Sequence, residues 1–571
     1  LNATYSYTGT FQWQKGSDLL SDIDYNGVSY NLGNTIQNSN THNLNTTLDM
    51  KRLYSYLGLT KKNGRSNSRS RNQLSKSNKE SQGEQDKTKT KTKSGSGNKL
   101  ANTAIDVLTM VKRIQVNYSE NNGSMLPGYL LTPGFIGTLK PTLGYTFGSQ
   151  ADVREMAARK GWLTVYPEFN QQYTATTFKQ LDFSANIEPL KDLKIDLIAN
   201  RVYAENYTEN YKIEDTNFDG ILDYNSLTPN TFGNFSISTI MLKTSFSKSD
   251  ENSSKAFEEF RQNRLEIARR LAQQNGVDMS NPNNFENGNT NGYPLGYSKS
   301  SQAVLLPAFL AAYTGKDAGS VKLGALRDVP VPNWDIKYTG LMNLKWFKDR
   351  FKRFSLTHGY RSSYTINQYR ANLDYTAPVK TGSGVLEDYD NQPTNALNQS
   401  GDYKNKTLYS NINLTEMFSP LIRIDMEMKN SVKILAEIKR DRMLSLSFDN
   451  NLMTEVLGKE YTLGLGYRFK DVRIKSKLAG PRKIIVSDLN MKADVSIRDN
   501  KTIIRYLDLE NNQVTSGQTV WNIKYSADYA FSKNLTGIFY FDYTFSEYAI
   551  STSFPQTTIR SGITLRYNFG N

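Results

Sequence analysis

The side chains best suited to chemistry gather in one acidic segment, DTNFDGILDYNS, residues 215–226. Its residues follow the numbering of an EF-hand-type loop: Asp215, Asn217 and Asp219 at positions 1, 3 and 5, Gly220 at position 6 and Asp223 at position 9. Oxygen ligands at this spacing could bind Ca2+. Position 12, where such loops carry a bidentate Glu, is Ser226, so weak affinity is expected. The segment is either a weak calcium site or an ordinary acidic turn.

Residues for other chemistry are scarce. The chain has two histidines, His42 and His358, and no cysteine. A hydrolase built on a Ser–His or Asp–His arrangement would need one of them, and neither lies in a recognisable catalytic motif. Zinc ligands, thiol sites and a phosphate-binding loop are lacking as well. We therefore predict a protein that is not an enzyme, with no catalytic residues and no cofactor apart from the calcium that residues 215–226 could bind.

The elements that carry these residues have a two-residue period, which NATYSYTGTFQWQ (residues 2–14) illustrates. Alternate side chains of a strand point to opposite faces. One face is aromatic, with Tyr5, Tyr7, Phe11 and Trp13, and the other is polar and uncharged. Aromatic rings suit a boundary between hydrocarbon and water, so these four residues are predicted to face lipid. A half-buried strand of a soluble sheet is the alternative.

The same alternation recurs along the chain and predicts sixteen to eighteen strands. Examples are 44–50, 143–147, 178–187, 193–211, 334–344, 461–469, 489–497, 521–531, 535–545 and 559–569. No apolar run is long enough for a transmembrane helix, and the mean hydropathy is -0.59. A barrel remains compatible with this value, because its strands turn only every second residue to lipid. Leu1 already lies in a strand pattern, which suggests a piece of a longer protein.

The predicted connections fall into two classes. Short turns are expected at 187–193, 345–351, 418–422 and 531–536, and long polar loops at 212–232, 370–404, 449–459 and 499–519. This alternation is typical of an outer-membrane barrel, with turns in the periplasm and loops outside. The chain would then have to cross the membrane outward once within residues 248–331. The candidate for this crossing is 304–313, which could be a strand or a helix. Residues 421–448 would be one long strand or three short ones with a turn at 439–442.

Three segments are not strands. Residues 254–276 carry a helical apolar stripe, within an insertion expected at 248–303, and 151–162 form a shorter helix. Residues 60–99 have almost no apolar content and are predicted to be a disordered linker. Residues 51–100 hold fourteen Lys and Arg and three Asp and Glu, which supplies +11 of the net charge of +15. Because no aromatic residue lies among the charges of 60–99, nucleic-acid binding is not expected, whereas attraction to lipopolysaccharide or another polyanion remains open.

Several long stretches closely resemble the SprA (Sov) family, the outer-membrane translocons of type IX secretion. They are GFIGTLKPTLGYTFGSQ (134–150), VLLPAFLAAYTGKD (304–317), VPNWDIKYTGL (331–341), LTHGYRSSY (356–364), EYTLGLGYRFKDVRIK (460–475) and GITLRYNFGN (562–571). The resemblance spans most of the chain, apart from the Lys- and Ser-rich tract 60–99. Family members are several times longer, so residues 1–571 would be the C-terminal part of a single 36-strand barrel in the bacterial outer membrane.

The resemblance implies a channel that exports folded cargo proteins and supports gliding motility. Its partners would be the remainder of the same large barrel, a PorV-type barrel, a periplasmic plug protein, secreted cargo and outer-membrane lipid. Tyr567 and Phe569 close the last alternating strand and are expected to form the aromatic assembly signal of bacterial barrels. A large porin or nutrient-receptor barrel and a soluble surface adhesin are the alternatives.

Overall fold

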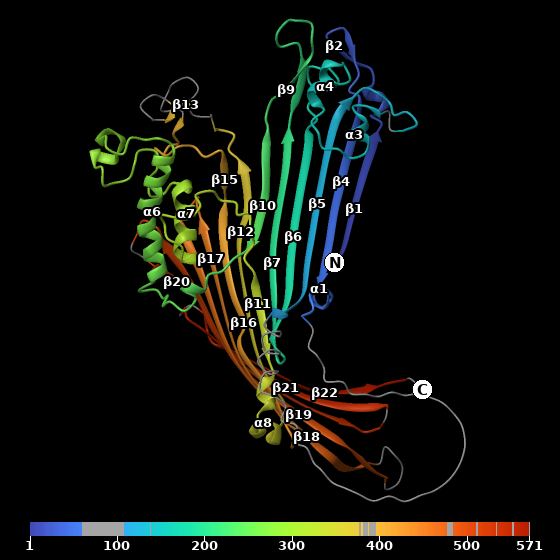
Figure 1. The fold of residues 1–571 in the computed structure, drawn as a ribbon, viewed down its shortest axis with the longest axis vertical. Helices are drawn as coiled ribbons and strands as arrows, with labels where there is room; N and C mark the ends of the chain where they lie inside the picture. The colour runs from blue at the N-terminus through green and yellow to red at the C-terminus, as the bar shows by residue number, and fades with distance from the viewer. Residues whose placement is uncertain are drawn as a thin grey trace, which may run out of the picture.

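Sixteen strands of the described residues form one antiparallel sheet, and shorter elements lie at its two ends (Figure 1). The computed structural model describes the chain except residues 60–107, 137–138, 376–378, 381–385, 388–395, 477–482, 510–511, 533, 551–552 and 570–571. The predicted fold class, an all-β antiparallel sheet with a few short helices, is confirmed. Among the described residues, none of the helices combines the length and the apolar character that crossing a membrane requires.

Neighbouring strands in the sheet largely follow chain order, as in a series of hairpins. The strands are β1 (Asn2–Gln14), β4 (Asn34–Asp49), β5 (Val111–Tyr129), β6 (Tyr173–Leu190), β7 (Leu193–Glu209), β10 (Asn230–Ser238), β11 (Asn333–Tyr338), β12 (Phe351–Ala371), β15 (Thr407–Tyr409), β16 (Asn411–Met428), β17 (Val432–Ser447), β18 (Leu452–Ser476), β19 (Lys483–Tyr506), β20 (Asn512–Ala530), β21 (Leu535–Tyr548) and β22 (Gln556–Tyr567). β1 and β22 are the edges, and within the described residues each has a partner on one side only.

The two ends of the sheet carry different elements (Figure 1). The upper end in Figure 1 has η1 (Asp18–Leu20), β2 (Ile23–Tyr25), β3 (Val28–Tyr30), α3 (Leu143–Thr146), α4 (Arg154–Arg159), β8 (Tyr211–Glu214), β9 (Asp223–Ser226), β13 (Val379–Lys380) and β14 (Leu386–Glu387). The lower end has α1 (Met50–Tyr56), η5 (Gly340–Asn343) and α8 (Lys345–Arg350).

The predicted turn at 187–193 is confirmed as a tight lower turn at 191–192, and α4 confirms the helix predicted within 151–162. The tract 60–99 lies outside the described residues.

Several predicted connections are wrong. Residues 418–422 lie inside β16, where the pairing with β17 shifts between Phe418 and Ile422, and residues 439–442 lie inside β17. Pro420 can sit in this strand because a bulge frees its backbone from the ladder. Segment 421–448 has its turn at 429–431 instead. Most of 449–459 and 499–519, which were predicted as long loops, is strand. Residues 143–147, predicted as a strand, contain α3, which Thr142 caps through its side chain.

The outward crossing predicted for 248–331 does not exist, because β10 and β11 share one position in the sheet. Both strands pair antiparallel with β7 on one side and with β12 on the other. β10 pairs with Arg201–Thr208 of β7, and β11 pairs with Leu193–Ile198. The two strands therefore run in the same direction, one after the other, and residues 239–332 interrupt them. We call 239–332 the helical insertion.

The helical insertion packs on the upper part of the sheet beside β12 and β17 (Figure 1). It contains α5 (Leu242–Ser245), α6 (Lys255–Gln274), η3 (Pro282–Asn284), η4 (Glu286–Gly288) and α7 (Gln302–Thr314). The helix predicted at 254–276 is confirmed as α6, whose Phe257, Phe260 and Ile267 are buried. Residues 304–313 form the helix α7 and not a strand. Both helices pack against sheet residues such as Tyr364 and Leu444, so the insertion and the sheet share one core.

Candidate functional site

The cross-strand register sorts the side chains of the sheet into two faces of opposite character. One row of directly paired residues, from β6 to β22, is wholly apolar: Leu190, Leu193, Tyr338, Leu356, Ile424, Ala436, Leu463, Val495, Ile523, Tyr543 and Ile559. The adjacent row on the other face, from β7 to β22, is wholly polar: Lys194, Lys337, Thr357, Arg423, Glu437, Thr462, Ser496, Asn522, Thr544 and Thr558. We call these the Leu463 face and the Thr462 face.

The lower part of the Leu463 face is an exposed apolar band. Leu463 itself is 50% exposed, and Ile559 and Ile563 are 60% and 74% exposed. On β18 the band runs from Tyr461 to Phe469, which matches the roughly 9–11 residues that a tilted strand needs to cross a bilayer. A soluble monomer rarely exposes a continuous apolar patch of this kind. The band therefore has the exposure and length that a surface in contact with hydrocarbon would need.

Aromatic rings gather at both margins of the apolar band. At the upper margin the partly exposed Trp334 stacks, with ring centroids 4.6 Å apart, on Tyr360, which is itself buried against Met241 of the insertion. At the lower margin the pairs Tyr467–Phe469 and Tyr567–Phe569 have centroids 4.4 and 4.8 Å apart. A further cluster at the lower end contains Trp346, Phe347, Phe351 and Phe354. Aromatic girdles at the two interfaces are the usual pattern of outer-membrane barrels.

An ion-pair ladder of alternating sign crosses the Thr462 face. Its order is Arg353, Asp425, Arg423, Glu437, Lys439, Glu460, Arg498 and Asp441, on strands β12, β16, β17, β18 and β19. The distances between successive partners lie between 2.9 Å, for Arg353–Asp425, and 3.8 Å, for Arg423–Glu437. Burying so many charges in lipid would be very costly, so this face requires water.

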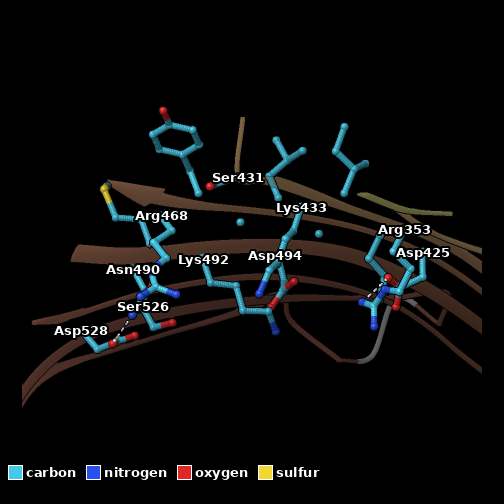
Figure 2. A pocket seen from close by; sticks show the side chains of 17 residues that line it. Arg353, Asp425, Ser431, Lys433, Arg468, Asn490, Lys492, Asp494, Ser526 and Asp528 are labelled. Carbon is cyan, nitrogen blue, oxygen red and sulfur yellow. Dashed lines mark hydrogen bonds and ion pairs between the residues drawn. The ribbon is translucent and has the colours of Figure 1, made fainter. Parts of the chain in front are cut away.

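Below the ladder, the Thr462 face has a shallow cavity of about 370 Å³ (Figure 2). Gly464 and Gly466 of β18 form part of its lining between Lys433 and Lys492. A Cβ at Gly464 would lie 2.5 Å from Asp494 Oδ1, so glycine leaves room for that carboxylate across the strand. Figure 2 shows Lys433, Lys492 and Asp494 along this hollow. The cavity is open, and apolar groups as well as charged side chains line it.

Above the apolar band, the Leu463 face is covered by the helical insertion and carries two buried ion pairs. Arg505 Nη2 lies 2.8 Å from Glu455 Oε2, and both side chains are fully buried. Arg505 also donates to Ser249 Oγ and to the carbonyl of Asp250 in the insertion. The second pair joins Arg442 to Glu416, and Arg442 donates to Thr244 Oγ1. These contacts fasten the insertion to the sheet.

The predicted calcium ligands lie together in the upper connection between β8 and β9, and their oxygens serve the loop itself. Asp215 accepts backbone N–H groups of Asp219 and Gly220, at 3.1 and 2.8 Å. Asp223 accepts Thr216 Oγ1 and Asn217 Nδ2, at 2.7 and 3.3 Å. In the described part of the chain, no three His, Cys, Asp or Glu side chains form a group that could hold a metal. Calcium binding at this loop stays a prediction.

The four aromatic residues of β1 fall into two environments. The Phe11 ring packs on Tyr145 with centroids 6.2 Å apart, and Trp13 Nε1 donates to the carbonyl of Leu131 at 3.1 Å. Phe11 and Trp13 therefore contact protein and are only partly exposed, and lipid contact of their exposed surface stays a prediction. Tyr5 and Tyr7 are more exposed, although Tyr7 Oη donates to the Phe147 carbonyl at 2.6 Å, and lipid contact at these two positions stays a prediction. The alternation in β1 could not reveal that Leu131 and Tyr145 contact its upper half.

The other residues that the sequence singled out lie on the sheet or beside its end. His42 is in β4, where Nδ1 contacts Tyr5 Oη at 2.8 Å, and His358 is in β12, where Nδ1 contacts the Leu421 carbonyl at 2.6 Å. Tyr567 ends β22, and the Phe569 ring lies beside it, 92% exposed. Their role as an assembly signal stays a prediction.

Sequence reasoning missed the buried ion pairs and the ladder. A usable signal was present, because Glu416, Arg442, Glu455 and Arg505 place charges where strand alternation would put apolar residues. Such interruptions indicate either a water-lined face or a covering layer. The structure shows the second.

No family model and no curated protein matches this chain. Among solved structures, it is similar to OmpT, an in-vitro folded outer membrane protein of Vibrio cholerae in trimer form, at 10% sequence identity. The likeness covers 70% of this chain and 94% of that one, with a TM-score of 0.16. A score this low supports no argument, so the conclusion comes from the register alone. The chain has the two-faced antiparallel sheet that is typical of an outer-membrane β-barrel wall.

Proposed function

We propose that this chain is a section of the wall of a large outer-membrane barrel that conducts proteins. The observation that carries the proposal is the pair of adjacent rows on β6–β22, one wholly apolar and one wholly polar. An apolar row facing lipid and a polar row facing a lumen make a wall between hydrocarbon and water. The long connections then lie outside the cell and the tight turns in the periplasm.

The finer function rests on the resemblance to the type IX secretion translocons. In this proposal the unpaired edges of β1 and β22 join the remainder of a 36-strand barrel. Folded cargo passes along the Thr462 face, a PorV-type barrel binds at the side, and a plug protein closes the periplasmic mouth. The face needs no catalytic group for this task, because passage through a wide pore requires only a hydrated wall.

A matched pair of substitutions tests the wall. Leu463→Arg places a charge inside the apolar band, one step below its upper end at Tyr461, where it costs up to about 4 kcal/mol in lipid. Thr462→Arg places the same charge on the opposite face beside Glu437 and Glu460. We expect Leu463→Arg to lower the amount of urea-resistant, membrane-inserted protein several-fold and Thr462→Arg to leave it unchanged. Equal effects of the two substitutions would contradict a lipid boundary.

A second experiment separates the three functional classes. An adhesin leaves the membrane in carbonate or urea, whereas a barrel leaves only in detergent. Purification in mild detergent should then retain a second barrel protein and a periplasmic plug if the chain belongs to a translocon. Recovery of this protein without either partner would favour a porin or nutrient receptor.

A further inference from the structure

Two cations on the Leu463 face lie at the boundary between the apolar band and the helical insertion. Arg440 of β17 and Lys459 of β18 are a directly opposed cross-strand pair. On the same face, they are the next side chains above Ile438 and Tyr461, which are the upper members of the band on these two strands. Like charges directly opposite each other destabilise a sheet unless an anion lies between them. The pair therefore calls for a counter-charge.

Neighbouring carboxylates form no ion pair with these two cations, although Asp499 stands opposite Lys459 on β19. Among the described residues, no carboxylate lies within ion-pair distance of Arg440 or Lys459, and the surrounding acids are engaged elsewhere. Glu416 pairs with Arg442, and Asp499, opposite Lys459, accepts Thr519 Oγ1 at 3.2 Å. Acidic residues of the insertion pair with lysines: Asp250 with Lys248 and Glu251 with Lys501.

The surroundings of the pair resemble a membrane interface. Phe246, just after α5, is 58% exposed, and its ring centroid lies 5.1 Å from the Arg440 guanidinium carbon. The exposed Leu242 begins the same short helix. Apolar rings and side chains next to unpaired cations suit the depth at which acyl chains meet headgroups.

We propose that Arg440 and Lys459 bind the phosphate of an anionic lipid headgroup at the upper margin of the band. The guanidinium can donate two parallel hydrogen bonds to a phosphate, and the ammonium supplies a second charge across the strand pair. This inference rests on the proposed function, since it requires the band to lie in the outer membrane. With the long connections outside, the headgroup belongs to the phosphorylated lipid A of the outer leaflet.

The test uses the full-length protein, purified from outer membranes in mild detergent, with retained lipid A quantified by mass spectrometry. Arg440→Gln with Lys459→Gln should lower retention by about fivefold for each charge removed. Lys524→Gln with Arg560→Gln removes the same charge from the Thr462 face and should retain as much lipid A as the unmodified protein. The swap Arg440→Lys with Lys459→Arg keeps both charges and should preserve retention.

Two results would overturn the inference: unchanged retention in the neutral double variant, or equal retention of lipid A from which the phosphates have been removed. Urea extraction of the same membranes separates this failure from failure of the proposed function. If the protein resists urea, and the neutral double variant retains as much lipid A as the unmodified protein, only the headgroup site is refuted. Protein that urea releases refutes the membrane wall as well.

Discussion

At the scale of single residues, the buried ion pairs above the band decide how the helical insertion is held. Glu455 and Arg505 are fully buried, and Ser249 donates to the same Glu455 oxygen at 2.7 Å. Removing one member of a buried pair leaves an uncompensated charge, which usually costs about 3–5 kcal/mol, whereas replacing both by apolar residues can be neutral. The pair is therefore a better probe of attachment than any apolar contact.

We predict that Arg505→Met loosens the insertion, because Glu455 then stays buried without its partner. Hydrogen exchange of α6 and α7 should become markedly faster, and limited proteolysis should begin within 239–332. The double variant Glu455→Leu with Arg505→Met serves as the control and should recover most of the protection. If the single variant is as protected as the unmodified protein, the ion pair does not hold the insertion.

At the scale of elements, the sequence predicts strands well and their covering layers poorly. The strands at 178–187, 461–469 and 535–545 were recognised because alternation alone specifies a two-faced strand. The run 304–313 was ambiguous because α7 is buried on all sides and has no polar stripe to reveal a helical period. The shared position of β10 and β11 could not be predicted either, since only pairing with β7 and β12 reveals it.

For the candidate site, too, the sequence predicts the faces of single strands but not what covers them. The polar and apolar rows could be read from the alternation, although the depth of each strand in a membrane could not. Phe11 and Trp13 show the limit, because their rings match a lipid-facing pattern and yet contact Tyr145 and Leu131. The ladder required the register, since its members come from five strands.

The last strand carries the element-scale prediction. Tyr567 pairs with Leu535, and Phe569 lies beyond the end of β22. If these rings are the assembly signal, deletion of 567–571 should abolish insertion and leave the protein in the periplasm. The matched variant Arg566→Gln, on the Thr462 face of β22, should insert normally. Normal surface exposure of the truncated protein would contradict the prediction.

At the scale of the whole molecule, the placement of the longer connections predicts an orientation. The long connections 15–33 and 210–229 and the described residues of 130–172 lie at the upper end, and the helical insertion leaves the sheet in its upper part. The connection between β4 and β5 is the exception, because α1 follows β4 at the lower end and β5 starts there at Val111. Both points of attachment of the basic tract 60–99 are therefore on the side of the tight turns.

This arrangement predicts that the tract 60–99 faces the periplasm. An epitope inserted after Gln82 should be inaccessible to antibody on intact cells and become labelled when the outer membrane is permeabilised. An epitope inserted after Phe218, in the upper connection between β8 and β9, should be labelled on intact cells. Labelling of the Gln82 epitope on intact cells would reverse the orientation of the wall. A periplasmic tract would also have no access to lipopolysaccharide of the outer leaflet, so its charge would have to serve a periplasmic polyanion or solubility alone.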